Sequence, residues 1–369
     1  MFLTGTYYCI ALIAAVCFCG LLTHKIGGVA FYGPIFLLLV FFAGARASWV
    51  GTDAAAYVLG YRNFQGIEEV GERLTDTESG EIEVKSVFTE WGFTLLQAAA
   101  QLVSNEYWAL FTLVAVVCVS SHLLSFHSLS ENVLISVYIL LTTTWYFFFF
   151  NGFRQGVALA VYTLSFNALL KRDLKMYIFW VVLAMTFHRS AFFALPVYFL
   201  FTKPNTTKVN ILIFLFGLFC VFFLRNLIGI AAETVSEKYA IYATGYDTSG
   251  KNYAAFYMFL AIFFLLCKQY IPLEDRFEYD TFLNMVLFGG VLNIAVAFGN
   301  GASDLMRMSI YFIVGVCYLW PILLRNVRSL VLPFVSMQFL FFLYMSRKTT
   351  AIKYYSFNEW IAPILGPWK

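Results

Sequence analysis

Two short segments place polar and charged side chains inside apolar runs. Arg154 and Gln155 in NGFRQGVALA directly follow WYFFFF, and His188 and Arg189 stand together in FHRS, within the run 176–201. A guanidinium stays charged and grips phosphate or carboxylate oxygens in bidentate fashion, while an imidazole exchanges a proton near neutral pH. Because charge is costly at bilayer depth, both segments predict a functional site or a helix end at a wet surface.

Acids and phenols share helical faces on either side of a long hydrophilic segment. Asp53, Tyr57 and Tyr61 recur every four residues, which places a carboxylate and two phenols on one face of a helix. Glu90 opens the amphipathic segment TEWGFTLLQAAAQL, where an acid is favoured by the helix dipole. The alternatives are an N-capping Asp53 with interfacial tyrosines and a Glu90 that serves only the helix start.

Further arginines occur in later segments. Asp304, Arg307 and Tyr311 are spaced i, i+3 and i+7, so they share one helical face. A salt bridge between Asp304 and Arg307 at the helix start is the alternative to a binding role for Arg307. Arg225 lies within the apolar run 209–230.

A stripe of small residues runs along the segment that carries Arg154. Gly152, Gly156 and Ala160 recur every four residues, a spacing that lets a helix approach its neighbour closely. At 100° per residue, Arg154 lies nearly opposite this stripe. One helix face is therefore predicted to pack while the other presents the guanidinium.

The composition indicates a polytopic membrane protein. Of the 369 residues, 61% are hydrophobic and 12% charged, and mean hydropathy is +0.77. A net charge of +3 without a cluster of lysines and arginines gives no indication of a nucleic-acid partner. The 7 cysteines lie in apolar runs without metal-ligand spacing, so neither a disulfide framework nor a metal site is predicted.

Successive apolar runs predict an all-α fold with about 11–12 transmembrane helices in a single transmembrane domain, 1–369. The run 176–201 is interrupted by FHRS. It forms either two short helices folded back on each other or one helix that faces a wet cavity. The predicted runs are 4–22, 29–47, 107–124, 133–150, 155–170, 176–201, 209–230, 253–271, 281–299, 308–324 and 329–345.

The loops predict the orientation in the membrane. If 176–201 crosses the membrane twice, basic short loops such as KRDLK, TKPNTTK and RNVR fall on one side, which the positive-inside rule makes cytoplasmic. The acidic segment 48–106, with an amphipathic helix inserted in it, then becomes a long extracytoplasmic loop. Snorkelling to lipid phosphate would explain any one arginine at the outer helix ends, but several together predict an anion site. These arginines are Arg154, Arg189, Arg225 and Arg307.

GTDAAAYVLGYRNF, TEWGFTLLQ, NGFRQGVALA, FHRSAFFALP and RMSIYF, in this order, resemble the polysaccharide polymerases of the EpsG-like and O-antigen (Wzy) type. The resemblance covers about residues 50–315, and its sharpest part is Arg-Gln-Gly-x-Ala followed by Phe-His-x-Ser. It implies a GT-C-like helix arrangement and a membrane glycosyltransferase. The reaction implied is polymerisation of polyprenyl-pyrophosphate-linked repeat units at the outer face of the bacterial cytoplasmic membrane.

The implied chemistry assigns roles to the candidate residues. A pyrophosphate leaving group must be stabilised and an acceptor hydroxyl must lose its proton, tasks that suit arginines and a base without any metal or cofactor. His188 is the first choice as base, with Asp53 and Glu90 as alternatives; an imidazole bonded to a backbone carbonyl is the non-catalytic alternative. The partners implied are lipid-linked donor and acceptor, membrane lipids and, as a further candidate, a chain-length regulator. The predicted substrate-binding residues are Arg154, Gln155, Arg189, Arg307, Tyr311, Tyr57 and Arg225.

Two other classes of membrane protein share part of this pattern. A secondary transporter or flippase for an anionic or lipid-linked sugar substrate would also use arginines in a cavity. Such proteins usually show paired halves with matching interrupted helices, which this sequence lacks. A membrane acyltransferase would require a histidine and an acid closely spaced in sequence, and no such pair is present.

Overall fold

The computed structural model describes residues 4–64, 90–219, 250–298 and 306–365. These residues form an all-α protein with no β-strand among them; one isolated antiparallel bridge joins Arg46 and Phe357. The chain divides into two compact units. The first unit comprises Met1–Asn167, Lys175–Phe192 and Leu330–Lys369, and the second comprises Ala168–Leu174 and Phe193–Ser329. A single transmembrane domain over 1–369 stays a prediction.

The described helices are those of a multi-pass membrane protein. Six are long and apolar enough to cross a membrane, or seven if one bent pair forms a single span. Three shorter apolar helices, Gly28–Gly44, Leu174–Phe187 and Thr207–Phe219, accompany them. The total of 11–12 spans stays a prediction. The six are Gly5–Thr23, Tyr107–Leu129, Lys251–Tyr270, Arg276–Phe298, Arg307–Asn326 and Arg328–Ser346.

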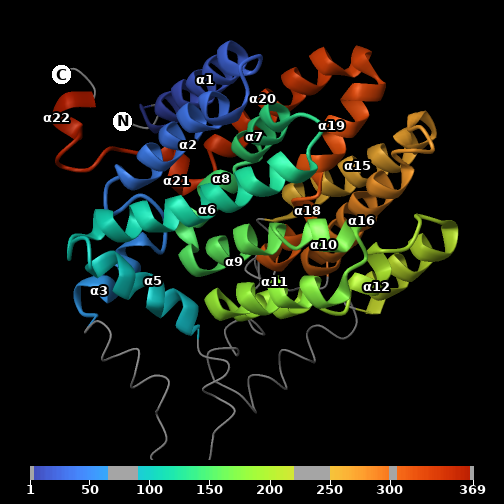
Figure 1. Ribbon diagram of the computed structural model, residues 1–369, viewed down its shortest axis with the longest axis horizontal. Helices are drawn as coiled ribbons and strands as arrows, with labels where there is room; N and C mark the ends of the chain where they lie inside the picture. Colours follow the sequence, from blue (N-terminus) through green and yellow to red (C-terminus); the bar gives the residue numbers. More distant parts are fainter. Residues whose placement is uncertain (1–3, 65–89, 220–249, 299–305, 366–369) are drawn as a thin grey trace, which may run out of the picture. The chain divides into compact units, whose positions relative to one another are not determined.

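In the first unit, α6 (Tyr107–Leu129) lies between α2 (Gly28–Gly44) and α9 (Phe153–Thr163) and packs on both (Figure 1). Two short helices, α3 (Ala54–Arg62) and α5 (Trp91–Gln101), lie side by side at one edge of this unit (Figure 1). Its remaining helices are α1 (Thr4–Thr23), α7 (Val133–Thr142), α8 (Trp145–Asn151), α11 (Leu174–Phe187), α20 (Val331–Ser346), α21 (Thr350–Lys353) and α22 (Ala362–Leu365).

The run 133–150, predicted as one helix, is broken, and of the two alternatives for 176–201 the single helix is wrong. The run 133–150 bends by 50° between α7 and α8, where Thr144 adopts a left-handed backbone with φ of 68°. The run 176–201 is not one helix, because α11 ends at Phe187 and a 3-10 helix, Arg189–Ala194, follows before α12 (Tyr198–Phe201). His188 therefore lies between the end of α11 and the start of the 3-10 helix, and not inside a helix.

A fully buried arginine organises the aromatic core of the first unit. The guanidinium carbon of Arg46 lies 3.9 Å from the ring centroid of Phe111, 4.3 Å from that of Phe150 and 5.1 Å from that of Phe153. Its backbone bridge to Phe357 holds the C-terminal segment against the end of α2. Rings that surround a cation attract it electrostatically, which fixes α8 and the start of α9 around one charge.

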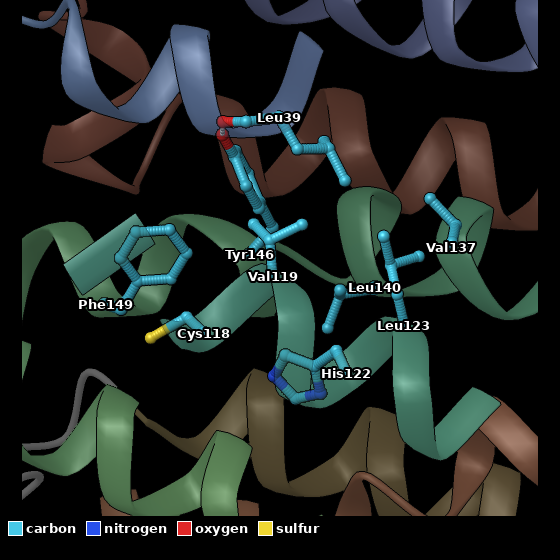
Figure 2. Close-up of a pocket in the computed structure, with 9 residues that line it drawn as sticks. All are labelled: Leu39, Cys118, Val119, His122, Leu123, Val137, Leu140, Tyr146 and Phe149. Atoms are coloured by element: carbon cyan, nitrogen blue, oxygen red, sulfur yellow. Dashed lines mark hydrogen bonds between the residues drawn. The ribbon is translucent and has the colours of Figure 1, made fainter. Parts of the chain in front are cut away.

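The same unit contains a small enclosed cavity that cannot be the substrate site. Figure 2 shows its lining, with His122 and Cys118 from α6 and Tyr146 from α8. Its volume is about 10 Å³, room for at most a single water molecule. The Tyr146 hydroxyl donates a 2.5 Å hydrogen bond to the Leu39 carbonyl (Figure 2), so it serves to join α8 to α2.

The second unit is built on α15 (Lys251–Cys267) and α16 (Arg276–Phe298), which pack along each other, with α12, α18 (Ile310–Ile313) and α19 (Val316–Asn326). A buried polar network lies on α16. Asp280 pairs with Lys268 at 2.8 Å and accepts a 3.0 Å hydrogen bond from the backbone N–H of Asn205. Asn205 also donates to Asn284 at 2.8 Å, so the loop after α12 is bound to α16 through buried polar groups.

Candidate functional site

Three segments of the first unit meet at one carboxylate, that of Glu90. One oxygen of Glu90 accepts a hydrogen bond from Nη1 of Arg154, and the other, Oε1, lies 2.5 Å from Nδ1 of His188. The backbone N–H of Arg189 donates to the same Oε1 at 3.4 Å. Glu90 therefore joins the start of α5, the start of α9 and the end of α11 in one charged cluster.

Close backbone packing brings Glu90 to His188. Gly92, in the first turn of α5, faces the last turn of α11: a Cβ at Gly92 would lie 2.4 Å from Oγ1 of Thr186 and 3.0 Å from its carbonyl carbon. No larger residue fits there without displacing one of the helices. Glu90 and His188 each lie two residues from this contact. The contact therefore fixes the distance between their side chains.

The loop before α3 is packed just as closely. Gly51 has a left-handed φ of 117°, and a Cβ on it would lie 2.2 Å from the carbonyl oxygen of Phe150. The N–H of Thr52 donates to Oδ1 of Asn151 at 2.9 Å. These contacts place Asp53, at the start of α3, beside the junction of α8 and α9.

The predicted packing stripe on α9 is confirmed at Gly156. A Cβ there would lie 2.3 Å from Cβ of Phe149, so α9 contacts α8 without an intervening side chain. Arg154, across the helix, keeps 48% of its side chain exposed, although Glu90 beside it is only 12% exposed. Gly156 thus packs α9 against α8, while the guanidinium of Arg154 in the first turn of α9 stays exposed.

Stacked aromatic rings connect this turn to the core. Tyr57 stacks on Phe153 with ring centroids 4.3 Å apart and an angle of 13°, and its centroid lies 5.9 Å from the guanidinium carbon of Arg154. Phe153 in turn lies against the buried Arg46. Tyr57 therefore lies beside Arg154, and its stacking on Phe153 fixes the position of its ring against the aromatic core.

The charged cluster opens into a pocket of about 630 Å³, a size suited to a small-molecule or sugar ligand. Arg154, Arg189, Glu90 and Asp53 give it charges of both signs, and two helices supply the rest of its wall. The lining residues are Thr52, Asp53, Ala56, Tyr57, Gly60, Phe64, Glu90, Phe93, Thr94, Gln97, Arg154 and Arg189.

Glu90 carries its charge at neutral pH. Burial by itself raises the pKa of this carboxyl. The hydrogen bond and charge of His188, the charge of Arg154 and the N–H of Arg189 outweigh burial, so the pKa lies below the usual glutamate value. The same ionised carboxylate accepts from Nδ1–H of His188, so in the neutral form of the imidazole Nε2 is the nitrogen that can accept a proton. Nε2 has no hydrogen bond to any residue that the structure describes, and the side chain is 30% exposed.

The structure brings six of the predicted residues together. Five of them line the pocket: Arg154, Arg189, Asp53, Tyr57 and Glu90. His188 is not a lining residue, but it is hydrogen-bonded to Glu90 in the pocket wall. The alternative of a histidine bonded to a backbone carbonyl is wrong, because the partner of Nδ1 is a carboxylate. Glu90 and Asp53 do occupy the N-cap positions of their helices, but neither side chain caps its own helix.

Four other candidates are not among the residues that line this pocket. Gln155 is buried and outside the pocket wall, and its Nε2 lies 3.5 Å from Oγ of Ser190, which ties α9 to the segment after His188. Arg307 and the buried Tyr311 belong to the second unit. Arg225 falls outside the described residues, as does Asp304, the alternative partner of Arg307. Binding roles for Arg307, Tyr311 and Arg225 stay predictions.

Sequence reasoning missed several pocket residues although their spacing was visible. Thr94 and Gln97 follow Glu90 by four and seven residues, and Gly60 follows Asp53 by seven, so each shares a helix face with a residue that was singled out. The partnership between Glu90 and His188 had no sequence signal, because 98 residues separate them. Within the described parts of the chain, no group of three His, Cys, Asp or Glu residues could hold a metal ion.

Together, the apolar helices define a multi-pass membrane protein, and its first unit contains a pocket with a cluster of Arg, Glu and His side chains at its edge. Residues 29–359 match the family model described as EpsG family. The chain belongs to the EpsG family, a family of Wzy-like polymerases. No curated protein and no solved structure matches the chain. The GT-C-like arrangement of helices therefore stays a prediction.

Proposed function

We propose that this protein is a glycosyltransferase of the bacterial cytoplasmic membrane. It joins polyprenyl-pyrophosphate-linked oligosaccharide repeat units into O-antigen or exopolysaccharide at the outer face. The observation that carries the proposal is the cluster in which Glu90 pairs with Arg154 and His188, at the edge of a 630 Å³ pocket, in a member of the EpsG family.

The bond changes set what the pocket must supply. An acceptor hydroxyl oxygen attacks the anomeric carbon of the donor sugar, and the bond between that carbon and the pyrophosphate oxygen breaks. The electron pair of this bond leaves with the lipid pyrophosphate, and the hydroxyl proton passes to a base. Catalysis therefore requires cations for the leaving group, a base for the proton and a surface that aligns the two substrates.

Arg154 and Arg189 suit the leaving group. Both line the pocket and are exposed, and a guanidinium has five N–H donors, so Arg154 can keep its bond to Glu90 while it contacts phosphate oxygens. Glu90 holds Arg154 in place before the substrate arrives. A fixed cation stabilises charge that develops at the leaving oxygen without a cost of reorganisation.

His188 suits the proton. Glu90 holds its Nδ1–H, so the tautomer that accepts at Nε2 is favoured and the imidazolium that forms is stabilised by the adjacent carboxylate. Asp53 is a second carboxylate in the pocket wall and the alternative base. Glu90 itself is paired with Arg154 and His188 and acts through these two side chains.

A deletion in the native host tests the function. If the protein is a polymerase, the long ladder of surface polysaccharide on a gel disappears while a single-repeat species survives. Loss of every repeat-bearing species would instead indicate a flippase or transporter. A reconstituted assay completes the test: the purified protein in nanodiscs should lengthen the single-repeat lipid that the deletion strain accumulates.

Arginine variants test the site with a matched control. Arg154→Ala and Arg189→Ala are expected to abolish the ladder while the protein remains inserted. Arg325 is the control, because it is also an exposed arginine, 42% against 48% for Arg154, and also pairs with a carboxylate, Asp275, but does not line the pocket. A wild-type ladder in both pocket variants would refute the role of the arginines.

A further inference from the structure

The pocket extends well beyond the charged cluster, along α3 and α5. Glu90, Thr94 and Gln97 follow one face of α5, and at 1.5 Å per residue Gln97 lies about 10 Å along the helix from Glu90. Gly60 occupies the corresponding place on α3, two turns beyond Asp53. The pyrophosphate and the reacting atoms need only the charged end, so the other end is available for another part of the substrate.

This second end is uncharged but polar. Thr94 is 3% exposed as a whole residue, and no hydrogen bond of its hydroxyl is found within the part of the chain that the structure describes. The amide of Gln97 likewise has no partner among the described residues, although both side chains line the pocket. Because both side chains line the pocket, the hydroxyl and the amide can donate hydrogen bonds to a ligand there and accept them from it.

Aromatic rings complete the wall. Phe93 and Phe64 line the pocket and are buried, and Phe93 packs edge-on against Tyr57 at 5.6 Å. Polar groups that fix orientation, set among apolar and aromatic surfaces, are the general pattern of a ligand pocket. A pyranose ring matches this pattern, because it has hydroxyls on its edge and C–H groups on its faces.

We propose that Thr94, Gln97 and the Gly60 edge of α3 form a subsite for an uncharged sugar residue of the lipid-linked oligosaccharide. This inference rests on the proposed function and deepens it: it assigns specificity for the glycan to α3 and α5, and leaves the pyrophosphate to Arg154 and Arg189. Thr94, Gln97 and Gly60 cannot act as a general acid or a general base at neutral pH, so their contribution is to binding.

Gly60 offers a steric test of the subsite. A Cβ at Gly60 would meet no heavy atom within 4 Å, so a larger side chain there enters open space in the pocket and does not collide with the protein. Gly60→Leu should therefore fold and exclude the sugar. Ala55→Leu is the matched control, because Ala55 is an exposed residue of the same helix that does not line the pocket.

The experiment measures initial rates of chain lengthening in nanodiscs against the concentration of the single-repeat lipid extracted from the deletion strain. Thr94→Val and Gln97→Leu are each expected to raise the half-saturating concentration about three- to ten-fold with little change in the maximal rate, as for loss of one neutral hydrogen bond in binding. Gly60→Leu should raise it more than either. Thr94→Ser keeps the hydroxyl and should restore the wild-type value.

A second measurement does not depend on any variant. The repeat-unit oligosaccharide released from the lipid by mild acid, which carries no pyrophosphate, should inhibit wild-type chain lengthening competitively, and Gln97→Leu should weaken this inhibition. The subsite is refuted if the free oligosaccharide does not inhibit, or if the Thr94, Gln97 and Gly60 variants behave as Ala55→Leu. Failure of the wild-type protein to lengthen the lipid-linked chain would refute the proposed function itself.

Discussion

Replacing Glu90 and His188, singly and together, measures whether these two side chains act as one catalytic unit. Glu90→Gln preserves the shape of the side chain but removes the charge that holds Nδ1–H of His188 and the guanidinium of Arg154. His188→Gln removes the imidazole, the proposed proton acceptor. Neither change enlarges a side chain at the edge of the pocket, so both variants should insert and fold.

The structure sets the expected magnitudes. Loss of a positioned general base costs about 10²–10⁴-fold in rate, so His188→Gln should fall in this range. Glu90→Gln removes charge-assisted hydrogen bonds that contribute about 1.5–3 kcal/mol each, and loss of one of them in the transition state gives about a 10- to 150-fold reduction. If Glu90 acts through His188, the double variant should lose clearly less than the product of the two single losses, and any loss beyond that of His188→Gln alone measures the contribution of Glu90 through Arg154.

The assay is the initial rate of chain lengthening in nanodiscs at saturating single-repeat lipid, where weaker substrate binding does not lower the rate. Two controls share the chemistry of the changes but lie away from the pocket. His127→Gln alters a histidine that pairs with Tyr32, and Glu106→Gln alters the exposed acid before α6. Both should keep the wild-type rate.

Two results would overturn the reasoning. If the double variant shows the product of the two single losses, about 10³–10⁶-fold, the side chains act independently and Glu90 does not work through the imidazole. If His188→Gln retains the wild-type rate, the histidine takes no part in the chemistry. Asp53 would then be the remaining candidate for the base.

Further predictions concern packing, charge and pH. Gly92→Ala should push α5 from α11 and lower the chain-lengthening rate, whereas Gly152→Ala, whose Cβ would meet nothing closer than 3.7 Å, should not; equal rates would contradict this. Arg307→Ala should abolish the polysaccharide ladder without loss of inserted protein, and an intact ladder would leave Arg307 a structural role only. Because the pKa of Glu90 is lowered, its ion pairs stabilise the fold fully above the ordinary value of 4.5 and are lost as the pH falls through the lowered value. The difference in melting temperature between wild type and Glu90→Gln should therefore shrink only below about pH 4.5, and shrinkage near pH 6 would refute the assignment.

Much of the fold and half of the site were visible in the sequence because they depend on local patterns. Apolar runs of bilayer length required helices, since a backbone in lipid must satisfy its hydrogen bonds internally. The glycine stripe predicted the packed face of α9, and Gly156 lies on it. Charge inside apolar runs marked Arg154 and His188 as functional candidates, because the cost of burying charge is known without the structure.

Partners across helices could not be read in the same way. Glu90 is 64 residues from Arg154 and 98 from His188, and no periodicity links positions so distant. Arg46, within an apolar run that was predicted to be a helix, was not singled out, yet it is completely buried among three aromatic rings. The sequence pattern could not show that these rings converge on one cation.

What the sequence alone determined is the class of protein, the family resemblance and the side chains capable of chemistry, since composition, periodicity and motifs are properties of neighbouring residues. Only the tertiary structure decided which of these side chains meet. Contacts between helices require close steric fit between residues far apart in the sequence, as where Gly92 lies against Thr186. This contact brings Glu90 to His188, and contacts of this kind bring polar residues from separate segments together around one pocket.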